Sequence, residues 1–342
     1  MRVLLLGSHT NYNLEHYVYM NLVKLGHEVK FYGYREKLGR LANPIRMVIT
    51  RSKPIRDLAN LFWLNKINDE IKKIAESFHP DLVLSIKGEA VKPETVKRIK
   101  DELGAKTALW YPDDPRFFNS LVKYIAPSYD HVFTASEKAI GMYKEIGCEK
   151  VHFLPFACEP TVHKKLNPFN EEHTVINLNV VFVGTYTQRR SRLIKALERA
   201  RIKVEVYGPY WRYFKRGSNV HEGVYGPEMV KVFNSAKIVL NIHMEDDLPY
   251  KVNMRTFEST GCGSFLLIDK PYGLEKMFIY GSELVFYEDE KELIELAKYY
   301  LEHEDERIKV GERGGERAYR EHTYEERVKK LVSVIDVFGK TC

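Results

Sequence analysis

The stretch from Lys251 to Lys270, KVNMRTFESTGCGSFLLIDK, decides the fold. Asn253 is a suitable helix N-cap, because its side chain can accept a hydrogen bond from a first-turn N–H, and residues 254–260 then form a short predicted helix. A glycine at 261 ends that helix, and the apolar run 264–268 is typical of a buried parallel strand. A helix leading into a buried strand is the repeating unit of a parallel α/β sheet.

The start of this helix has the chemistry of an anion site. Its first-turn N–H groups, at Met254 and Arg255, have no intrahelical partner, and the positive end of the helix dipole favours a phosphate. Glu258 lies just over one turn further on, within reach of a hydroxylated group beside that phosphate. An ordinary strand-connecting helix with a solvated glutamate explains the stretch equally well.

Length and composition indicate a globular protein of two domains. The chain has 342 residues, of which 44% are hydrophobic and 29% charged, enough for two separate cores. Its 4 cysteines are scattered without a CxxC pair, which favours a reducing, cytoplasmic setting over a zinc or disulfide framework. No apolar run reaches the ~18 residues of a membrane span. The single glutamine, Gln188, among many charged residues resembles proteins of thermophilic organisms.

Two series of alternating strands and helices follow each other along the chain. Predicted strands of the first series are 3–7, 29–34, 82–86, 107–111, 132–135 and 151–156, and those of the second are 180–184, 204–207, 238–242, 264–268 and 284–287. Such alternation predicts parallel sheets with right-handed crossovers. The expected fold is therefore α/β, two tandem Rossmann-like domains facing across a cleft, over 1–158 and 159–323, with a last helix at 324–342.

The loop after the first strand of the second domain is a second candidate for anion binding. Gly184, Thr185 and Tyr186 follow the strand, and Arg189 and Arg190 begin the next helix. Arginine forks onto phosphate oxygens, so these side chains and Arg255 could clamp a diphosphate. A surface-facing basic helix start is the alternative. Neither a GxGxxG fingerprint nor a P-loop is present, which disfavours NAD enzymes and P-loop NTPases.

The first domain offers candidates for acid–base chemistry. Asp113 and Asp114 stand between two prolines after the fourth strand, where one carboxylate could act as a base or simply cap the next helix. His9, after the first strand, could polarise a hydroxyl, although a lone loop histidine is more often plain polar surface. The acidic run 245–247 is interpreted as a solvated loop, and no Asp-x-Asp pair occurs, so no metal site is expected.

Positive charge is concentrated in one segment. Between Arg35 and Arg56 there are seven basic residues against one acid, Glu36, in a chain of net charge +6. The segment could lie on an anionic membrane surface, which would make the protein peripheral at the inner face, or hold an anionic acceptor, or fold over the cleft as a loop. With no RNA-binding aromatic motif, nucleic acid is not an expected partner.

Several motifs together resemble one family. They are VFVG at 181–184, YGPYW at 207–211, NSAKIVLN at 234–241 and N-x-R-x-F-E-x-x-x-C-G at 253–263. They resemble the GT-B glycosyltransferases of the spore-maturation-protein (CgeB-like) type, and W-x-x-D-D-P at 110–115 is similar to the first domain of that family.

The resemblance implies an activity and a set of roles. A nucleotide-diphosphosugar, with a UDP-sugar expected, would bind the second domain without a metal or other cofactor, and an unidentified acceptor would bind the first. The last helix would cross back to the first domain. Related retaining enzymes have two glutamates separated by seven residues: the second, at the ribose, matches Glu258, whereas Tyr250 stands at the position of the first. Retention is favoured over inversion, in which Asp113 or Asp114 would be the base.

Two other functions remain open from the sequence. A nucleotide-sugar epimerase of the same fold would consume the donor without an acceptor. A non-enzymatic protein could use the basic segment to bind anions or a membrane surface, with steep salt dependence and no turnover.

Overall fold

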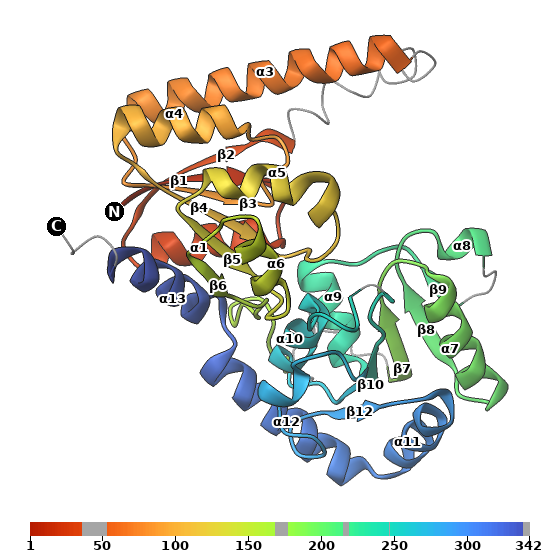
Figure 1. The fold of residues 1–342 in the computed structure, drawn as a ribbon. Coiled ribbons are helices and arrows are strands. Elements are labelled where there is room, and N and C mark those ends of the chain that lie inside the picture. The colour runs from red at the N-terminus through yellow and green to blue at the C-terminus, as the bar shows by residue number, and fades with distance from the viewer. Residues whose placement is uncertain (36–52, 168–176, 215–218, 246, 338–342) are drawn as a thin grey trace. The chain divides into compact units, whose positions relative to one another are not determined.

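The computed structural model describes residues 1–35, 53–167, 177–214, 219–245 and 247–337. The chain divides into two compact units, Met1–Pro155 with Val328–Cys342, and Phe156–Arg327. Each unit is built on a six-stranded sheet (Figure 1), in which all neighbouring strands pair in parallel. The predicted α/β fold of two Rossmann-like domains is therefore confirmed.

The sheet of the first unit has the order β2-β1-β3-β4-β5-β6. Its strands are β1 (Arg2–Gly7), β2 (Glu28–Gly33), β3 (Leu82–Ile86), β4 (Lys106–Tyr111), β5 (His131–Thr134) and β6 (Val151–Phe153). Its helices are α1 (Leu14–Lys24), α3 (Lys53–Phe78), α4 (Pro93–Leu103), the π-turn η1 (Phe118–Val122), α5 (Lys123–Ile125), the 3₁₀ turn η2 (Ala126–Ser128) and α6 (Ala139–Glu145). The apolar strands β1, β3 and β4 form the core, because nearly every side chain in them is buried on both faces.

The sheet of the second unit has the order β12-β11-β10-β7-β8-β9. Its strands are β7 (Leu178–Val183), β8 (Val204–Tyr207), β9 (Val220–His221), β10 (Ala236–Asn241), β11 (Leu266–Asp269) and β12 (Val285–Tyr287). Its helices are α7 (Gln188–Arg199), α8 (Trp211–Phe214), α9 (Gly226–Asn234), α10 (Met254–Gly261), the 3₁₀ turn η3 (Leu274–Lys276), α11 (Glu290–Glu302) and α12 (Glu304–Glu321).

The last helix, α13 (Tyr324–Val337), starts in the second unit and continues in the first. From Val328 onward it groups with the first unit. Lys330 Nζ donates to the main-chain oxygen of Phe153 at 3.1 Å, and Lys106 Nζ donates to that of Ile335 at 3.0 Å. These bonds tie the helix to strands β6 and β4.

The strand orders place a topological switch point in each sheet. In the first sheet the chain passes from β1 to β2 and then crosses to β3 on the other side of β1. In the second sheet it passes from β7 through β8 to β9 and then crosses to β10 on the other side of β7. Ligands of open parallel sheets bind outside the carboxyl ends of the strands at such a point. The loops after β7 and β10 in the second unit, and after β1 and β3 in the first, are therefore the places to look for a site.

Two short helical elements follow residues in the left-handed backbone region. The π-turn η1 follows Phe117, whose φ is +61°, and the short helix α8 follows Tyr210, whose φ is +69°. Within the described part of the chain no helix is long and apolar enough to cross a bilayer. Residues 36–52 of the basic segment lie outside the described residues.

Candidate active site

The glycine after strand β7 is required by contacts inside the unit. A Cβ on Gly184 would lie 2.9 Å from Cζ of Phe182, and the Gly184 oxygen accepts a hydrogen bond from the Trp211 indole at 2.7 Å. Packing against the neighbouring ring therefore favours glycine at this position.

The rest of this loop carries an aromatic stack and a helix cap. The ring of Tyr186 stacks on Phe214 with centroids 4.2 Å apart and meets the edge of Trp211. Thr187 is the N-cap of α7, and its side chain accepts from the N–H of Arg190 at 3.2 Å. Thr185 is exposed, and its main-chain oxygen accepts from Arg190 Nη1. The predicted loop residues thus gather at the carboxyl end of β7.

Arg190 is a buried cation without a carboxylate in contact. Its Nε donates to the oxygen of Ile242 at 2.8 Å and its Nη1 to that of Thr185 at 2.8 Å. Burial lowers the pKa of Arg190 to about 10, against the opposing charges of Asp269 and Asp247, and the positive charge of Arg255 adds to the fall. Among the described residues no carboxylate forms an ion pair with Arg190, although Asp269 and Asp247 lie near enough to act on its charge.

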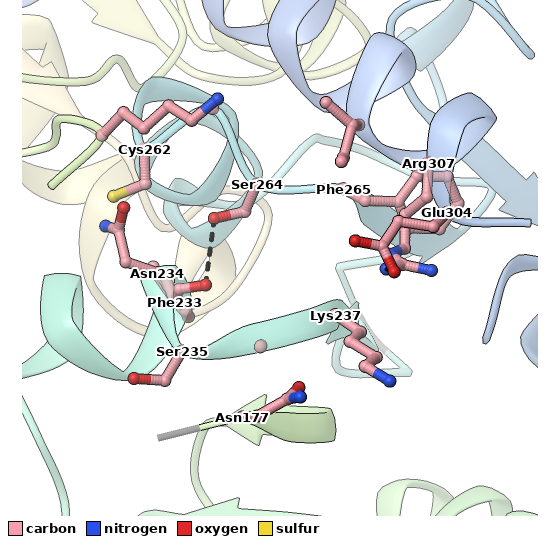
Figure 2. Close-up of a pocket in the computed structure, with 14 residues that line it drawn as sticks. Asn177, Phe233, Asn234, Ser235, Lys237, Cys262, Ser264, Phe265, Glu304 and Arg307 are labelled. Carbon is pink, nitrogen blue, oxygen red and sulfur yellow. Dashed lines mark hydrogen bonds and ion pairs between the residues drawn. The ribbon is translucent and has the colours of Figure 1, made fainter. Parts of the chain in front are cut away.

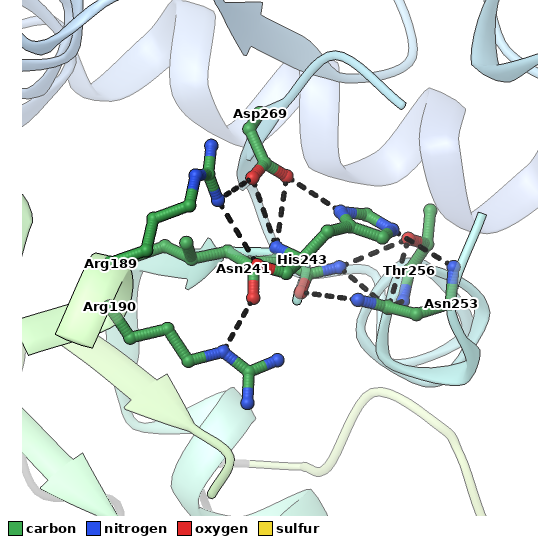
Figure 3. A network of polar contacts seen from close by, with 8 residues as sticks. Arg189, Arg190, Asn241, His243, Asn253, Thr256 and Asp269 are labelled. Carbon is green, nitrogen blue, oxygen red and sulfur yellow. Dashed lines mark hydrogen bonds and ion pairs between the residues drawn. The ribbon is translucent and has the colours of Figure 1, made fainter. Parts of the chain in front are cut away.

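Arg189 and Asp269 belong to a buried polar network with His243 (Figure 3). Arg189 Nη1 lies 2.5 Å from Asp269 Oδ2, and His243 Nδ1 lies 2.6 Å from Asp269 Oδ1. Burial alone would raise the pKa of Asp269, but the facing His243 and Arg189 hold it below its usual value. The network joins the ends of β10 and β11 to the start of α7, and it neutralises Arg189 within the unit.

The start of α10 has the predicted cap. The Asn253 side chain accepts from the N–H of Thr256 at 3.3 Å, and it exchanges two amide hydrogen bonds with Asn241 at 2.9 and 3.0 Å. In the part of the chain that the structure describes, the N–H groups of Met254 and Arg255 donate to nothing. The predicted helix start, with its N-cap and two free N–H groups, is therefore formed, and anion binding there stays a prediction.

Glu258 is at its predicted place one turn into α10, but it is covered. Its side chain is 2% exposed, because Arg255 forms an ion pair with Oε2, and Oε1 lies 3.7 Å from His163 Nε2. His163 Nδ1 accepts the N–H of Glu159, so Nε2 carries the proton. A ribose hydroxyl can reach the carboxylate only if the Arg255 guanidinium leaves it.

The segment between β10 and α10 contributes one more paired cation. Lys251 Nζ lies 3.4 Å from Asp247 and is 3% exposed. Tyr250, at the position of the missing glutamate, is partly exposed next to it. Arg189, Lys251 and Arg255 therefore each have a carboxylate partner, whereas Arg190 has none among the described residues.

In the first unit, the structure separates the two predicted catalytic aspartates. Asp114 is 0% exposed and accepts from Thr134 Oγ1 at 2.5 Å and from the Tyr143 hydroxyl at 3.0 Å. No acceptor can reach it, so the prediction of a catalytic Asp114 is wrong. Asp113 is 36% exposed, and Lys87 Nζ holds its Oδ2 at 2.7 Å.

Lys87, the partner of Asp113, acts on the charge of Glu15 near the switch point of this sheet. Lys87, at the end of β3, has a φ of +65°, a strained conformation for a side-chain-bearing residue. Burial raises the pKa of Glu15, against the opposing charges of Lys87 and Arg35. His9 is exposed and packs against the Phe31 ring at 4.6 Å. It has the predicted place after β1.

The described residues also bear on two other kinds of binding site. No cluster of three or more His, Cys, Asp or Glu that could hold a metal is found among them. A pocket of about 330 Å³ lies at the opposite, amino-terminal edge of the second sheet (Figure 2), between Ser235, Ser264 and Arg307. None of the predicted site residues lines it.

His243 and Asp269 are the site residues that the sequence analysis missed. The sequence analysis placed strands at 238–242 and 264–268, so each of these residues directly follows a predicted strand, but neither was considered for the site. The usable signal was their position, since a polar residue directly after a buried parallel strand lies at the ligand edge of the sheet.

Comparison with known proteins bears on this arrangement. Residues 189–333, which include both arginines, α10 and Asp269, match the glycosyl transferase-like family. The spore protein CgeB of Bacillus subtilis (strain 168) is 23% identical over 277 residues, covering 76% of this chain and 84% of that protein.

Two solved structures show the same fold over the whole chain. A glycosyltransferase from Rickettsia africae superposes with a TM-score of 0.69 at 11% identity, covering 100% of this chain and 99% of that one. HepE from Anabaena, in complex with UDP-glucose, gives a TM-score of 0.68 at 11% identity, covering 98% and 100%. The chain thus has the GT-B fold, and its resemblance to the CgeB-like glycosyltransferases is confirmed.

Proposed function

We propose that this protein transfers a sugar from a UDP-sugar to an acceptor hydroxyl without a metal ion. The observation that carries the proposal is the buried charge of Arg190, which no described carboxylate contacts and on which the charge of Arg255 acts, together with the free N–H groups of Met254 and Arg255 at the start of α10. A leaving nucleoside diphosphate gains negative charge as the glycosidic bond breaks, and prearranged donors stabilise that charge. HepE, of the same fold, binds UDP-glucose, which supports uridine as the base.

The donor site is assigned to the loops after β7 and β10. Arg190 and the start of α10 would neutralise the diphosphate, with Arg255 turning from Glu258 onto a phosphate oxygen. Glu258 would then be free to accept from the ribose hydroxyls. Gly184, Thr185 and Tyr186 would line the site on the β7 side, and Tyr250 would lie toward the sugar.

The acceptor is assigned to the first unit, with Asp113 as its base. Lys87 keeps the Asp113 carboxylate in place at 2.7 Å, and His9 after β1 would orient the acceptor. A carboxylate base implies inversion, whereas the likeness to retaining enzymes implies retention. NMR of the anomeric proton in the product distinguishes the two outcomes.

The test compares two substitutions on helix α7. Arg190→Lys keeps the charge but loses the planar fork, whereas Arg192→Lys makes the same change at an exposed position. UDP affinity, measured by calorimetry in EDTA, should fall about tenfold or more for Arg190→Lys, since a charged hydrogen bond contributes roughly 1.5–3 kcal/mol. It should be unchanged for Arg192→Lys. If the wild type does not bind UDP, the proposal is wrong, and binding of GDP, dTDP or ADP instead would name a different base.

Analysis of the reaction products in the absence of an acceptor distinguishes a glycosyltransferase from a nucleotide-sugar epimerase. A glycosyltransferase should slowly release UDP and free sugar from UDP-glucose by transfer to water. An epimerase would instead return a UDP-sugar with an altered sugar.

Peripheral membrane contact through residues 35–56 is a further part of the proposal, and cosedimentation with anionic but not neutral vesicles should reveal it.

A further inference from the structure

His243 joins the end of strand β10 to the start of helix α10, and both of its ring nitrogens are in use (Figure 3). Its side chain is 0% exposed. Nδ1 lies 2.6 Å from Asp269 Oδ1, and Nε2 lies 2.9 Å from the main-chain nitrogen of Asn253. A peptide nitrogen can only donate, so Nε2 accepts and the proton is on Nδ1, which donates to the carboxylate. The ring is neutral in one tautomer.

Asn253 is thereby held from two sides. Its main-chain N–H donates to His243, and its side chain pairs with that of Asn241 while capping Thr256. The position of this N-cap residue sets the direction of the next two N–H groups, at Met254 and Arg255. These are the groups that carry no partner in the described structure.

We infer that His243 is a positioning residue for the donor diphosphate. By accepting the Asn253 N–H, it fixes the start of α10 so that the N–H groups of Met254 and Arg255 face the phosphate oxygens before the donor arrives. The inference rests on the proposed function. Donors that are already in place need no rearrangement during the reaction, and this is what makes them effective.

Asp269 and Arg189 have a supporting role in this arrangement. Asp269 also accepts the main-chain N–H of His243, at 3.0 Å. The carboxylate is therefore hydrogen-bonded to both the ring and the backbone of the same residue. Arg189 Nη1 donates to Asp269 and, at 3.1 Å, to the His243 oxygen. Arg189, which the sequence analysis placed on the diphosphate, therefore acts through His243 in the free protein.

Two substitutions of His243 separate its two hydrogen bonds. In His243→Gln the side-chain oxygen can take the place of Nε2, which keeps the acceptor for Asn253 and gives up the donor to Asp269. In His243→Asn the amide nitrogen can take the place of Nδ1, which keeps the donor and gives up the acceptor. Both replace a buried ring by a smaller amide, so each is the control for the other's loss of packing.

The experiment measures UDP and pyrophosphate affinity by calorimetry, with melting temperature as the measure of folding. We expect His243→Asn to weaken both ligands at least tenfold, and His243→Gln to weaken them less than threefold, at similar melting temperatures. Equal weakening by the two variants, or none, would overturn the inference. If wild-type protein does not bind UDP, the proposed function fails and this inference fails with it. Wild-type binding with unchanged His243→Asn overturns the inference alone.

Hydrogen exchange of the wild type needs no variant that might fold poorly. If His243 fixes the helix start in the free protein, the hydrogen-bonded amides of Asn253 and Thr256 should already be protected and should slow little when UDP is added, whereas the free amides of Met254 and Arg255 should slow as they bond the phosphate. A large slowing at Asn253 and Thr256 on UDP binding would mean that the ligand orders the helix start, which contradicts the inference.

Discussion

The Tyr143 hydroxyl contacts both carboxylate oxygens of Asp114, at 3.1 and 3.0 Å, inside the core of the first unit. Burial and the facing carboxylate together raise the pKa of Tyr143, burial being the larger cause. Asp113, the preceding residue, turns to the surface and pairs with Lys87. Two neighbouring acids on one turn thus have different roles, one holding the fold and the other placed where an acceptor can meet it.

Asp114→Asn should destabilise the protein and Asp113→Asn should not. At position 114 the introduced amide would replace an oxygen that receives hydroxyl donors, and a lost hydrogen bond to a buried carboxylate costs roughly 2 kcal/mol of unfolding free energy. Asp113→Asn should change stability by less than about 0.5 kcal/mol, as exposed substitutions do, while lowering turnover. Urea denaturation and sugar release from the donor are the measurements. A stable but inactive Asp114→Asn variant would restore its catalytic role.

The strands and the position of α10 could be predicted from sequence because they depend on local pattern. Continuous apolar runs such as 82–86 fix buried parallel strands, and Asn253 before a helical stretch fixes a cap. The partners of polar side chains could not be predicted. Whether Asp113 or Asp114 is buried depends on Tyr143, which is 29 residues from Asp114 along the chain.

In the candidate site, too, the positions of residues could be predicted from sequence, but the partners of their side chains could not. Arg189 and Arg190 are adjacent and were given one role, but one side chain faces Asp269 and the other lies against main-chain oxygens of Thr185 and Ile242. Neighbouring helical residues point about 100° apart, so they meet different parts of the fold. Their separate roles depend on β10 and β11, which come later in the sequence.

Gly208→Ala should be strongly destabilising. Gly208 has a φ of +155°, and a Cβ there would lie 2.0 Å from the main-chain oxygen of Gly184. Because the Cβ would meet a main-chain atom, no side-chain rotation can relieve the clash. We therefore expect the free energy of unfolding to fall by roughly 3 kcal/mol. Gly141→Ala, in α6 with open space around it, is the control and should stabilise by about 0.5–1 kcal/mol. Thermal unfolding compares them, and equal melting temperatures would contradict the prediction.

The stabilisation by Asp269 should disappear in acid. The pKa of this carboxyl is lower in the folded protein than the usual value, because His243 and Arg189 outweigh the effect of burial. Its contribution is therefore present above the unfolded pKa of about 3.9 and is lost as pH falls through the lower folded value. The difference in unfolding free energy between wild type and Asp269→Asn should be largest near neutral pH and should shrink below about pH 4.

Asp101→Asn provides the comparison for that pH series. Asp101 is exposed on α4, so its substitution should give a small difference at every pH. Urea titrations between about pH 3 and 7 measure both series. A difference for Asp269→Asn that does not depend on pH would show that the charge of the carboxylate is not what stabilises the network.

Glu258→Gln should weaken binding of UDP but not of pyrophosphate. In the free protein Arg255 covers the Glu258 carboxylate, and in the proposed complex the arginine moves to the diphosphate while the carboxylate accepts from ribose. Glutamine keeps the shape but makes a weaker, uncharged acceptor, so UDP affinity should fall about tenfold, within the range for a charged hydrogen bond. Pyrophosphate has no ribose, and with Arg255 released from its partner its affinity should hold or rise. Calorimetry with the two ligands decides the matter: an equal loss for both would mean that Glu258 serves only to hold Arg255.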